Sequence, residues 1–431
     1  MSKPTSPSVV NTPIVISSPP CNPTDTKDKT SEKYSPQLKN KSKSSDPDTD
    51  PSSYVHENYP LASSSTGTQN TTKEEMEKEW ANIIKLRSKQ NHHFPNSQIN
   101  SRTSESDEIL SSDSDTNVEI KTSADQSYSE EAEKFFDLGL QSCEVNDKTP
   151  NFFEAAEYFR KSANLGHDRA QFNLGRMYEQ GRGIKQSFTS AAEWYAKAAL
   201  QGNPNAQCNL GGLFADGTGV NKDIEKAIDW YKKAALKGNI AAQFNLAKMY
   251  EKGQGVEKNE ALAFKYYTDA AELGDVEAQF NLAMMYKNGK GVDKSEVLAA
   301  DWFAKAAKLG NAKAQFELSM AYDNGKGVDK STKNAAFWRT KAALQGHAAA
   351  QFYLGLMYTF GNGVEKNHAT AAHYYKLSAE QGYSRAQLTL GDAYVAGKGV
   401  KKDVAEAAKW YSKASEQGID EATTKLRKLK I

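Results

Sequence analysis

Residue types that often carry out chemistry in proteins are scattered along this chain. Of its seven histidines, His368 and His373 lie five residues apart, which is a poor spacing for holding one metal ion jointly. Nucleophilic catalysis needs a unique arrangement of serine or cysteine with histidine, and no such arrangement stands out among side chains that recur along the sequence. The sequence therefore predicts no catalytic residues, no metal site and no enzyme activity.

Pairs of glycines, such as Gly217 and Gly219, superficially resemble the loops that hold phosphate groups. They lack the third glycine, the preceding strand and the lysine that such loops require. We interpret them as turns and expect no cofactor.

The three cysteines, Cys21, Cys143 and Cys208, show no regular spacing. This favours reduced thiols and a cytoplasmic location over a disulfide framework. The N-terminus lacks a cationic patch followed by an apolar core, and no stretch approaches the roughly 18 apolar residues of a membrane-spanning helix. We expect neither a signal peptide nor a transmembrane segment.

The strongest pattern is a repeat of 36 residues that runs without insertion or deletion. Its leading alanines are Ala170, Ala206, Ala242, Ala278, Ala314, Ala350, Ala386 and Ala422. Its closing glycines are Gly166, Gly202, Gly238, Gly274, Gly310, Gly346, Gly382 and Gly418. A fixed period of this length is typical of a solenoid or a related repeat architecture.

Each repeat is predicted to form two helices joined by a glycine turn. Ala170, Leu174 and Met177 fall on one helical face, and residues 191–199 carry a second apolar stripe. One pair cannot bury both stripes alone, so neighbouring pairs must stack. We predict an all-α fold, a right-handed α-solenoid of tandem helix-turn-helix repeats. Five of the six tryptophans share one register, and we expect them in the interior between repeats.

Composition divides the chain into two parts. Eleven of the 13 prolines precede residue 125, whereas 28 of the 29 glycines follow it. We interpret residues 1–126 as a disordered N-terminal tail, because its composition offers too little apolar surface for a core. Residues 127–431 form the predicted solenoid. Its parts are a degenerate capping repeat at 131–166, seven regular repeats at 167–418 and a C-terminal capping helix at 419–431.

One segment of the tail, residues 73–89, has the pattern of a short amphipathic helix. Met76, Trp80 and Ile83 share one face, with acidic residues early and basic residues late. Two interpretations stay open at this point. The segment is a docking helix for a partner or for the solenoid itself, or it is a transient helix without a binding role.

The repeat pattern A-x-x-x-L-G-x-x-Y-x-x-G-x-G-V, followed after six residues by A-x-x-W-Y-x-x-A-A-x-x-G, resembles the Sel-one-like repeat (SLR) family. This family is related to the tetratricopeptide repeat. The resemblance implies a non-catalytic scaffold or adaptor that binds a partner protein or peptide in the concave groove of the solenoid. The layout of tail and repeats is also similar to fungal chitin synthase regulators. That similarity implies an alternative, a regulatory subunit of an enzyme such as a chitin synthase or of a kinase pathway.

Candidate partner-binding residues are those on the first helix of each repeat that escape the repeat pattern. This helix lines the concave face in related solenoids. The expected face is polar in the early repeats and apolar in the later ones, which favours a docking surface there. The candidates are Asn173, Asn209, Asn245, Lys248, Met284, Met320, Tyr353, Leu356 and Phe360. The alternative is that these side chains pack against neighbouring helices.

Two further positions recur in the repeats. A glutamine recurs one residue after the leading alanine, as in Gln315 and Gln351, and predicts a hydrogen-bond ladder between adjacent units. A lysine recurs in the turns, as in Lys294 and Lys330, and an acidic residue precedes it in four of six cases. Because this neutralises much of the stripe and the net charge is only +1, we expect no nucleic-acid partner.

Overall fold

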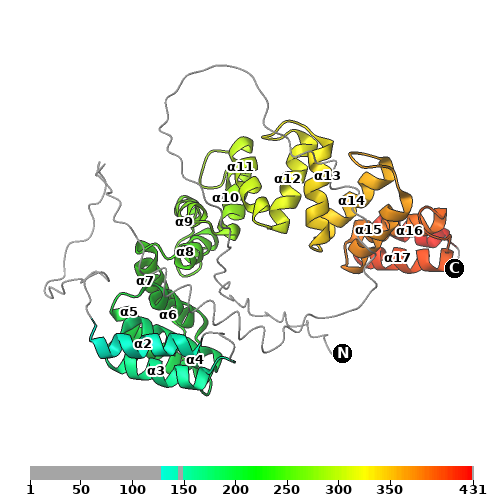
Figure 1. The fold of residues 1–431 in the computed structure, drawn as a ribbon. Helices are drawn as coiled ribbons and strands as arrows, with labels where there is room; N and C mark the ends of the chain where they lie inside the picture. The colour runs from blue at the N-terminus through cyan, green and yellow to red at the C-terminus, as the bar shows by residue number, and fades with distance from the viewer. Residues whose placement is uncertain (1–127, 144–148, 430–431) are drawn as a thin grey trace, which may run out of the picture. The chain divides into compact units, whose positions relative to one another are not determined.

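Seventeen α-helices and no β-strand make up the residues that the computed structural model describes, 128–143 and 149–429 (Figure 1). The helices are α2 (Glu130–Ser142), α3 (Phe152–Asn164), α4 (Asp168–Gln180), α5 (Phe188–Leu200), α6 (Pro204–Asp216), α7 (Ile224–Leu236), α8 (Ile240–Lys252), α9 (Glu260–Glu272), α10 (Val276–Asn288), α11 (Glu296–Lys308), α12 (Ala312–Asn324), α13 (Thr332–Leu344), α14 (Ala348–Phe360), α15 (His368–Glu380), α16 (Ser384–Ala396), α17 (Val404–Glu416) and α18 (Asp420–Lys428). Consecutive helical hairpins confirm the predicted all-α solenoid of 36-residue repeats. The predicted tail, with its segment 73–89, lies outside the described residues.

Local signals in the sequence explain where the helices begin and end. In the hairpin α12–α13, the Asn311 side chain accepts a hydrogen bond from the backbone N–H of Ala314 at 2.8 Å and so caps α12. Gly325 ends that helix in the left-handed conformation, with φ of 67°. Ser331 caps α13 through the backbone N–H of Asn334. Most other hairpins use equivalent residues, so most of the predicted turns and caps are found; α16 is an exception, because Tyr383 precedes it and forms no side-chain cap.

The second glycine of each turn is needed for a different reason, close packing between hairpins. A Cβ on Gly327 would lie 2.0 Å from the carbonyl oxygen of Glu296, the first residue of α11. No side chain fits at that distance, and the φ of 72° also favours glycine. The turn after α12 therefore packs against the start of the preceding hairpin's second helix.

The recurring glutamines form the predicted ladder between hairpins. Nε2 of Gln315 donates to the carbonyl of Ala307 at 3.1 Å, and Gln279 and Gln351 repeat this bond with the corresponding alanines. Where a second glutamine follows 30 residues later, it donates in turn to Oε1 of the first, as Gln345 does to Gln315 at 2.8 Å. The bond from Gln315 to Ala307 ties the end of one hairpin to the start of the next, and the bond from Gln345 links the end of the second hairpin back to its own first helix.

The most deeply buried aromatic side chains stand at the repeat position directly after that of the tryptophans. Tyr195 is completely buried, whereas Trp194 is only half-buried, with the ammonium of Lys197 3.8 Å from the centre of its ring. The same lysine–tryptophan stacking recurs, for example between Lys305 and Trp302 at 3.4 Å. Trp194, Trp230, Trp302 and Trp338 are only half-buried, which is less deep than expected, whereas Trp410 is buried in the core.

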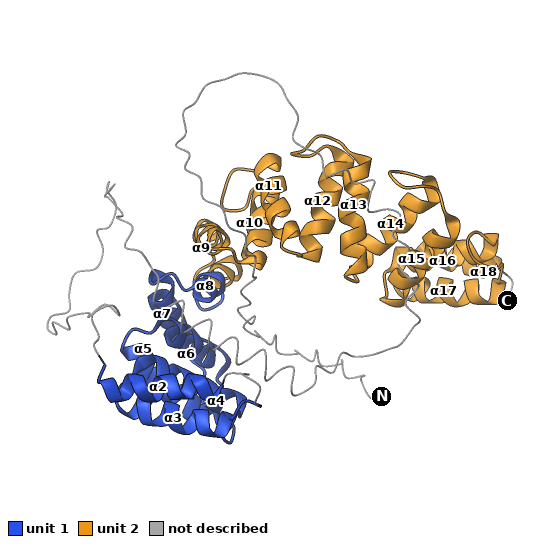
Figure 2. Cartoon of the chain, in the orientation of Figure 1, with its two compact units in different colours: residues 1–21, 63–246, 254–256 blue, residues 22–62, 247–253, 257–431 orange. Residues whose placement is uncertain are grey.

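The chain divides into two compact units (Figure 2). Among the described residues, unit 1 comprises 128–246 and 254–256, and unit 2 comprises 247–253 and 257–429. Each unit has hydrophobic clusters of its own. In unit 2, α18 packs against α17 through Ala422 and Leu426 and covers the last hairpin.

Candidate functional site

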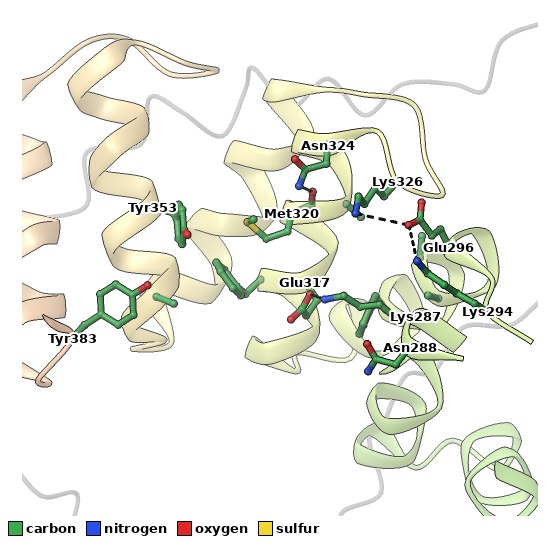
Figure 3. A pocket seen from close by; sticks show the side chains of 16 residues that line it. Lys287, Asn288, Lys294, Glu296, Glu317, Met320, Asn324, Lys326, Tyr353 and Tyr383 are labelled. Atoms are coloured by element: carbon green, nitrogen blue, oxygen red, sulfur yellow. Dashed lines mark hydrogen bonds and ion pairs between the residues drawn. The ribbon is translucent and has the colours of Figure 1, made fainter. Parts of the chain in front are cut away.

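Unit 2 contains a groove of about 510 Å³ formed mainly by α10, α11, α12 and α14 (Figure 3). Its lining residues are Lys287, Asn288, Lys294, Glu296, Ala299, Ala300, Phe303, Phe316, Glu317, Met320, Ala321, Asn324, Lys326, Ala349, Tyr353 and Tyr383. The first helices of successive hairpins supply most of them. Figure 3 shows Tyr353 and Tyr383 on one side of Met320, and Lys294, Glu296 and Lys326 on the other.

One half of the groove is aromatic. The rings of Phe316 and Tyr353 lie with centroids 5.8 Å apart, and Tyr383 enters from the turn before α16. Met320 lies next to them on α12, one turn beyond Phe316. These side chains are half-buried, so each leaves apolar surface open to a ligand.

The other half of the groove is charged. Nζ of Lys287 on α10 lies 2.6 Å from Oε2 of Glu317 on α12. Lys294 and Lys326 approach the same oxygen, Oε1 of Glu296, at 3.6 and 3.8 Å. The turn lysine is thus paired with the acidic residue that follows it rather than with the one that precedes it. Lys326 reaches Glu296 because the glycine turn after α12 packs on the start of α11.

A buried cation lies beneath the groove. Arg339 on α13 is 2% exposed and forms an ion pair with Asp323. Its Nη2 nitrogen contacts Sδ of Met320 at 3.3 Å, and its guanidinium lies over the Tyr353 ring at 5.5 Å. Nε of Arg339 has no hydrogen-bond partner. Arg339 therefore supports two of the side chains that line the groove.

His347 caps α14 beside the aromatic half. Its Nδ1 accepts a hydrogen bond from the backbone N–H of Ala350 at 3.2 Å, and its ring stacks on Phe316 at 4.9 Å. Burial lowers the pKa of His347 below its usual value, and Lys313 acts in the same direction, whereas Glu317 opposes it. The neutral ring is the form that can cap the helix, since Nδ1 must carry no proton.

The structure places the predicted binding residues of unit 2 in different surroundings. Met320 and Tyr353 line the groove. Met284 and Leu356 do not; both are partly buried against core clusters. Phe360 ends α14 with 67% of its surface exposed. Whether any of them contacts a partner stays a prediction.

Two of the predicted polar residues lie deeper in the fold. Asn173 and Asn245 are 7% and 6% exposed. The side chain of Asn209 is hydrogen-bonded to Tyr195, whose pKa is raised mainly by burial. Lys248 is half-buried, and burial lowers the pKa of its ammonium. Asn173 and Asn245 therefore offer little surface to a ligand, whereas Asn209 is half-buried like Met320. The role of all three asparagines as partner contacts stays a prediction.

Two residues of this region, Arg339 beneath the groove and Tyr383 in its lining, were missed by sequence reasoning although they break the repeat. Arg339 replaces the aromatic residue found one period earlier as Phe303 and one period later as Tyr375. Tyr383 stands where other hairpins have a capping residue such as Asn311. Departures from the period on buried or capping positions, and not only on the outward face, could have indicated this region.

Groups that would bind a metal ion are absent from the described part of the chain, which holds no cluster of three or more His, Cys, Asp or Glu side chains suited to one. Within those same residues, every helix is too short or too polar to cross a bilayer.

Comparisons with known proteins agree with the repeat architecture. A family model of the Sel1 repeat matches residues 145–167, 168–203, 204–239, 240–275, 276–311, 312–347, 348–383 and 384–419. A protective antigen of uropathogenic Escherichia coli strains with an SLR fold is 35% identical, with a TM-score of 0.66. That match covers 69% of this chain and 64% of the antigen, so the chain spans less than two thirds of it. A Sel1 repeat protein from Oxalobacter formigenes is 33% identical, with a TM-score of 0.54 over 69% of this chain and 86% of that one.

A search of curated proteins gave no significant match. The matches above do not support the further resemblance to fungal chitin synthase regulators.

Proposed function

The chain belongs to the Sel1 repeat family, and from this premise we propose that it is a non-catalytic scaffold or adaptor that binds a protein segment in the groove of unit 2. Proteins of this family are generally protein-interaction scaffolds. The observation that carries the proposal is the groove itself. It sets half-buried aromatic and thioether surface directly beside charged groups.

The size and composition of the groove suit a short peptide segment. A volume of about 510 Å³ accommodates a few side chains and falls in the usual range of ligand sites. Tyr353 and Tyr383 offer rigid apolar surface with a polar tip, and Met320 adapts its shape to the ligand. Leu356 and Phe360 follow Tyr353 on α14, and we propose that they extend the contact surface beyond the groove.

The alternative role, regulation of an enzyme, would use the same surface, because a regulatory subunit also has to hold a segment of its partner. No contact among the described residues favours it over a scaffold. A cytoplasmic location likewise stays a prediction.

Affinity capture with the full-length chain tests the proposal. The double variant Met320→Ala, Tyr353→Ala removes apolar surface from the groove. Leu236→Ala is the matched control, because Leu236 is 88% exposed and lies in unit 1. We expect partners to be lost with the double variant and kept with the control, at similar melting temperatures. Retention of every partner by the double variant would contradict the proposal.

A further inference from the structure

We propose that the groove selects segments in which an acidic side chain lies near an apolar anchor. This inference rests on the proposed function and specifies the chemistry of its ligand. The apolar anchor would contact Met320, Tyr353 and Tyr383. The acidic side chain would lie between Lys294 and Lys326.

The charges that line the groove do not cancel. Three lysines face it, Lys287, Lys294 and Lys326, against two carboxylates, Glu296 and Glu317. Arg339 beneath the groove is balanced by Asp323. The groove therefore keeps one positive charge in excess, which complements an acidic ligand.

The carboxylates are engaged, whereas the lysines have donors to spare. Glu317 is held by Lys287 at 2.6 Å. Glu296 faces two ammonium groups, Lys294 and Lys326, at 3.6 and 3.8 Å, distances longer than a normal hydrogen bond. Each ammonium carries three N–H donors, so one shared oxygen leaves most of them available. A ligand carboxylate placed between the two lysines would complete this arrangement.

These two lysines are also accessible to a ligand. Their side chains are 59% and 62% exposed, and neither has to leave the protein core to meet a ligand. A basic ligand would instead meet three lysines and would have to displace one of them from a carboxylate. The same exposure limits the strength of each new ion pair, because water and salt screen it.

The apolar anchor and the acid must belong to one segment. The two halves of the groove lie on either side of Met320, so a ligand that crosses it contacts both (Figure 3). Apolar contact alone would bind many sequences. The lysine pair adds discrimination between acidic and basic neighbours of the anchor.

Random-peptide display on the full-length chain tests this inference. Selection is run on three proteins. They are the wild type, the groove variant, which carries both Lys294→Glu and Lys326→Glu, and a control variant, which carries both Lys330→Glu and Lys366→Glu. The last variant makes the same change of charge at turn lysines outside the groove lining. We expect the wild type and this control to enrich peptides with Asp or Glu near an aliphatic or aromatic residue. The groove variant should lose that preference and favour basic neighbours.

The best selected peptide then serves as a probe. Replacing its acidic residue by the corresponding amide should weaken binding to the wild type by about fivefold, as expected for an exposed ion pair. The groove variant should bind the original peptide about tenfold more weakly, and high salt should reduce this difference. Equal binding to wild type and groove variant, or a selected motif without an acid, would overturn the inference.

The two proposals fail in different ways. If Met320→Ala, Tyr353→Ala binds the selected peptides as the wild type does, they bind elsewhere and the proposed function is wrong. If that variant loses them but Lys294→Glu, Lys326→Glu does not, the groove binds peptides and only the acidic preference is wrong. If no peptide is enriched on the wild type, both proposals are contradicted.

Discussion

The hairpins α4–α5 and α12–α13 bury different groups at the same position of the repeat. In the first, the hydroxyl of the fully buried Tyr195 donates a hydrogen bond to Oε2 of Glu179, at 2.6 Å. In the second, Arg339 takes the place of the tyrosine and pairs with Asp323. An acidic partner is present in both, but the neutral aromatic ring has become a charged guanidinium. Arg339 lies beneath the groove and contacts Met320 and Tyr353, which line it. The comparison suggests that residues which follow the repeat maintain the stacking of hairpins, while this residue, which departs from it, supports the proposed binding surface.

The largest effect is expected from breaking the regular hairpin. Tyr195→Ala removes a large, completely buried ring and leaves a cavity between α4 and α5. We expect a loss of about 3–5 kcal/mol in unfolding free energy. Urea unfolding followed by circular dichroism measures it. Tyr195→Phe is the control; it keeps the ring and should lose only the hydrogen bonds of the hydroxyl with Glu179 and Asn209, about 1–2 kcal/mol.

Restoring the regular residue in the exceptional hairpin should separate stability from binding. Arg339→Tyr, combined with Ser319→Ala, reproduces the pair found two repeats earlier at Ala247 and Tyr267. Asp323 stays in this variant; its side chain is 28% exposed to water, and it can accept a hydrogen bond from the new tyrosine as Glu251 does from Tyr267. The buried guanidinium, whose Nε has no hydrogen-bond partner, no longer has to be desolvated.

We therefore expect an unchanged or higher melting temperature for this double variant, together with weaker binding of groove ligands. The weakening follows because Met320 and Tyr353 lose their support. Thermal unfolding and titration of a selected peptide provide the two readouts. Unchanged affinity would mean that Arg339 does not position the groove.

A smaller gain is expected from completing the glutamine ladder. Oε1 of Gln279 is buried and has no hydrogen-bond partner, because Leu309 stands where other hairpins have a glutamine such as Gln345. Leu309 is 44% exposed, so its replacement loses little buried apolar surface. Leu309→Gln should raise stability by about 1 kcal/mol. Leu309→Glu is the control and should not raise stability, because a carboxylate offers no hydrogen-bond donor. An equal gain in stability from the two variants would exclude the hydrogen bond as the cause.

The smallest effect at neutral pH is expected at the histidine caps. Because folding lowers the pKa of His347, the unfolded chain binds protons more tightly than the folded one. The stability from this cap is fully present above the unfolded pKa of about 6.5 and is lost as pH falls through the lower folded pKa. His167 caps α4 in the same way and also has a lowered pKa.

Asn311 shows that asparagine fills this capping position without titrating. The test uses His347→Asn, because His167 is completely buried between Tyr128 and Phe136 and its replacement would leave a cavity. We expect His347→Asn to lose the stacking on Phe316 at every pH, but to lose less further stability than the wild type between neutral pH and pH 5. Melting temperatures across that range measure the difference. Parallel pH profiles for the two proteins would contradict the assignment.

The fold could be predicted because its signals are local and repeated. Caps such as Ser331 and turn glycines such as Gly325 act within a few residues, and the period shows that each hairpin must pack on the next. The depth of the aromatic registers was harder to predict. Trp194 and Tyr195 are adjacent and both apolar, and only the stacking geometry decides which one is enclosed.

The groove could be predicted only in part. Met320 and Tyr353 were found because they depart from the pattern on the expected face. Lys326 was not, because its position against Glu296 depends on how closely a glycine turn approaches the preceding hairpin. Contacts of this kind join residues 30 positions apart and leave no signature in either repeat alone.

The central claim is that the groove of unit 2 holds a protein segment. The most direct measurement is the dissociation constant of a display-selected peptide for the full-length wild type and for Met320→Ala, Tyr353→Ala, with Leu236→Ala measured in parallel. Loss of two truncated apolar contacts should weaken binding by at least about tenfold, while the control leaves it unchanged. Equal dissociation constants for all three proteins, at equal melting temperatures, would show that the segment binds elsewhere.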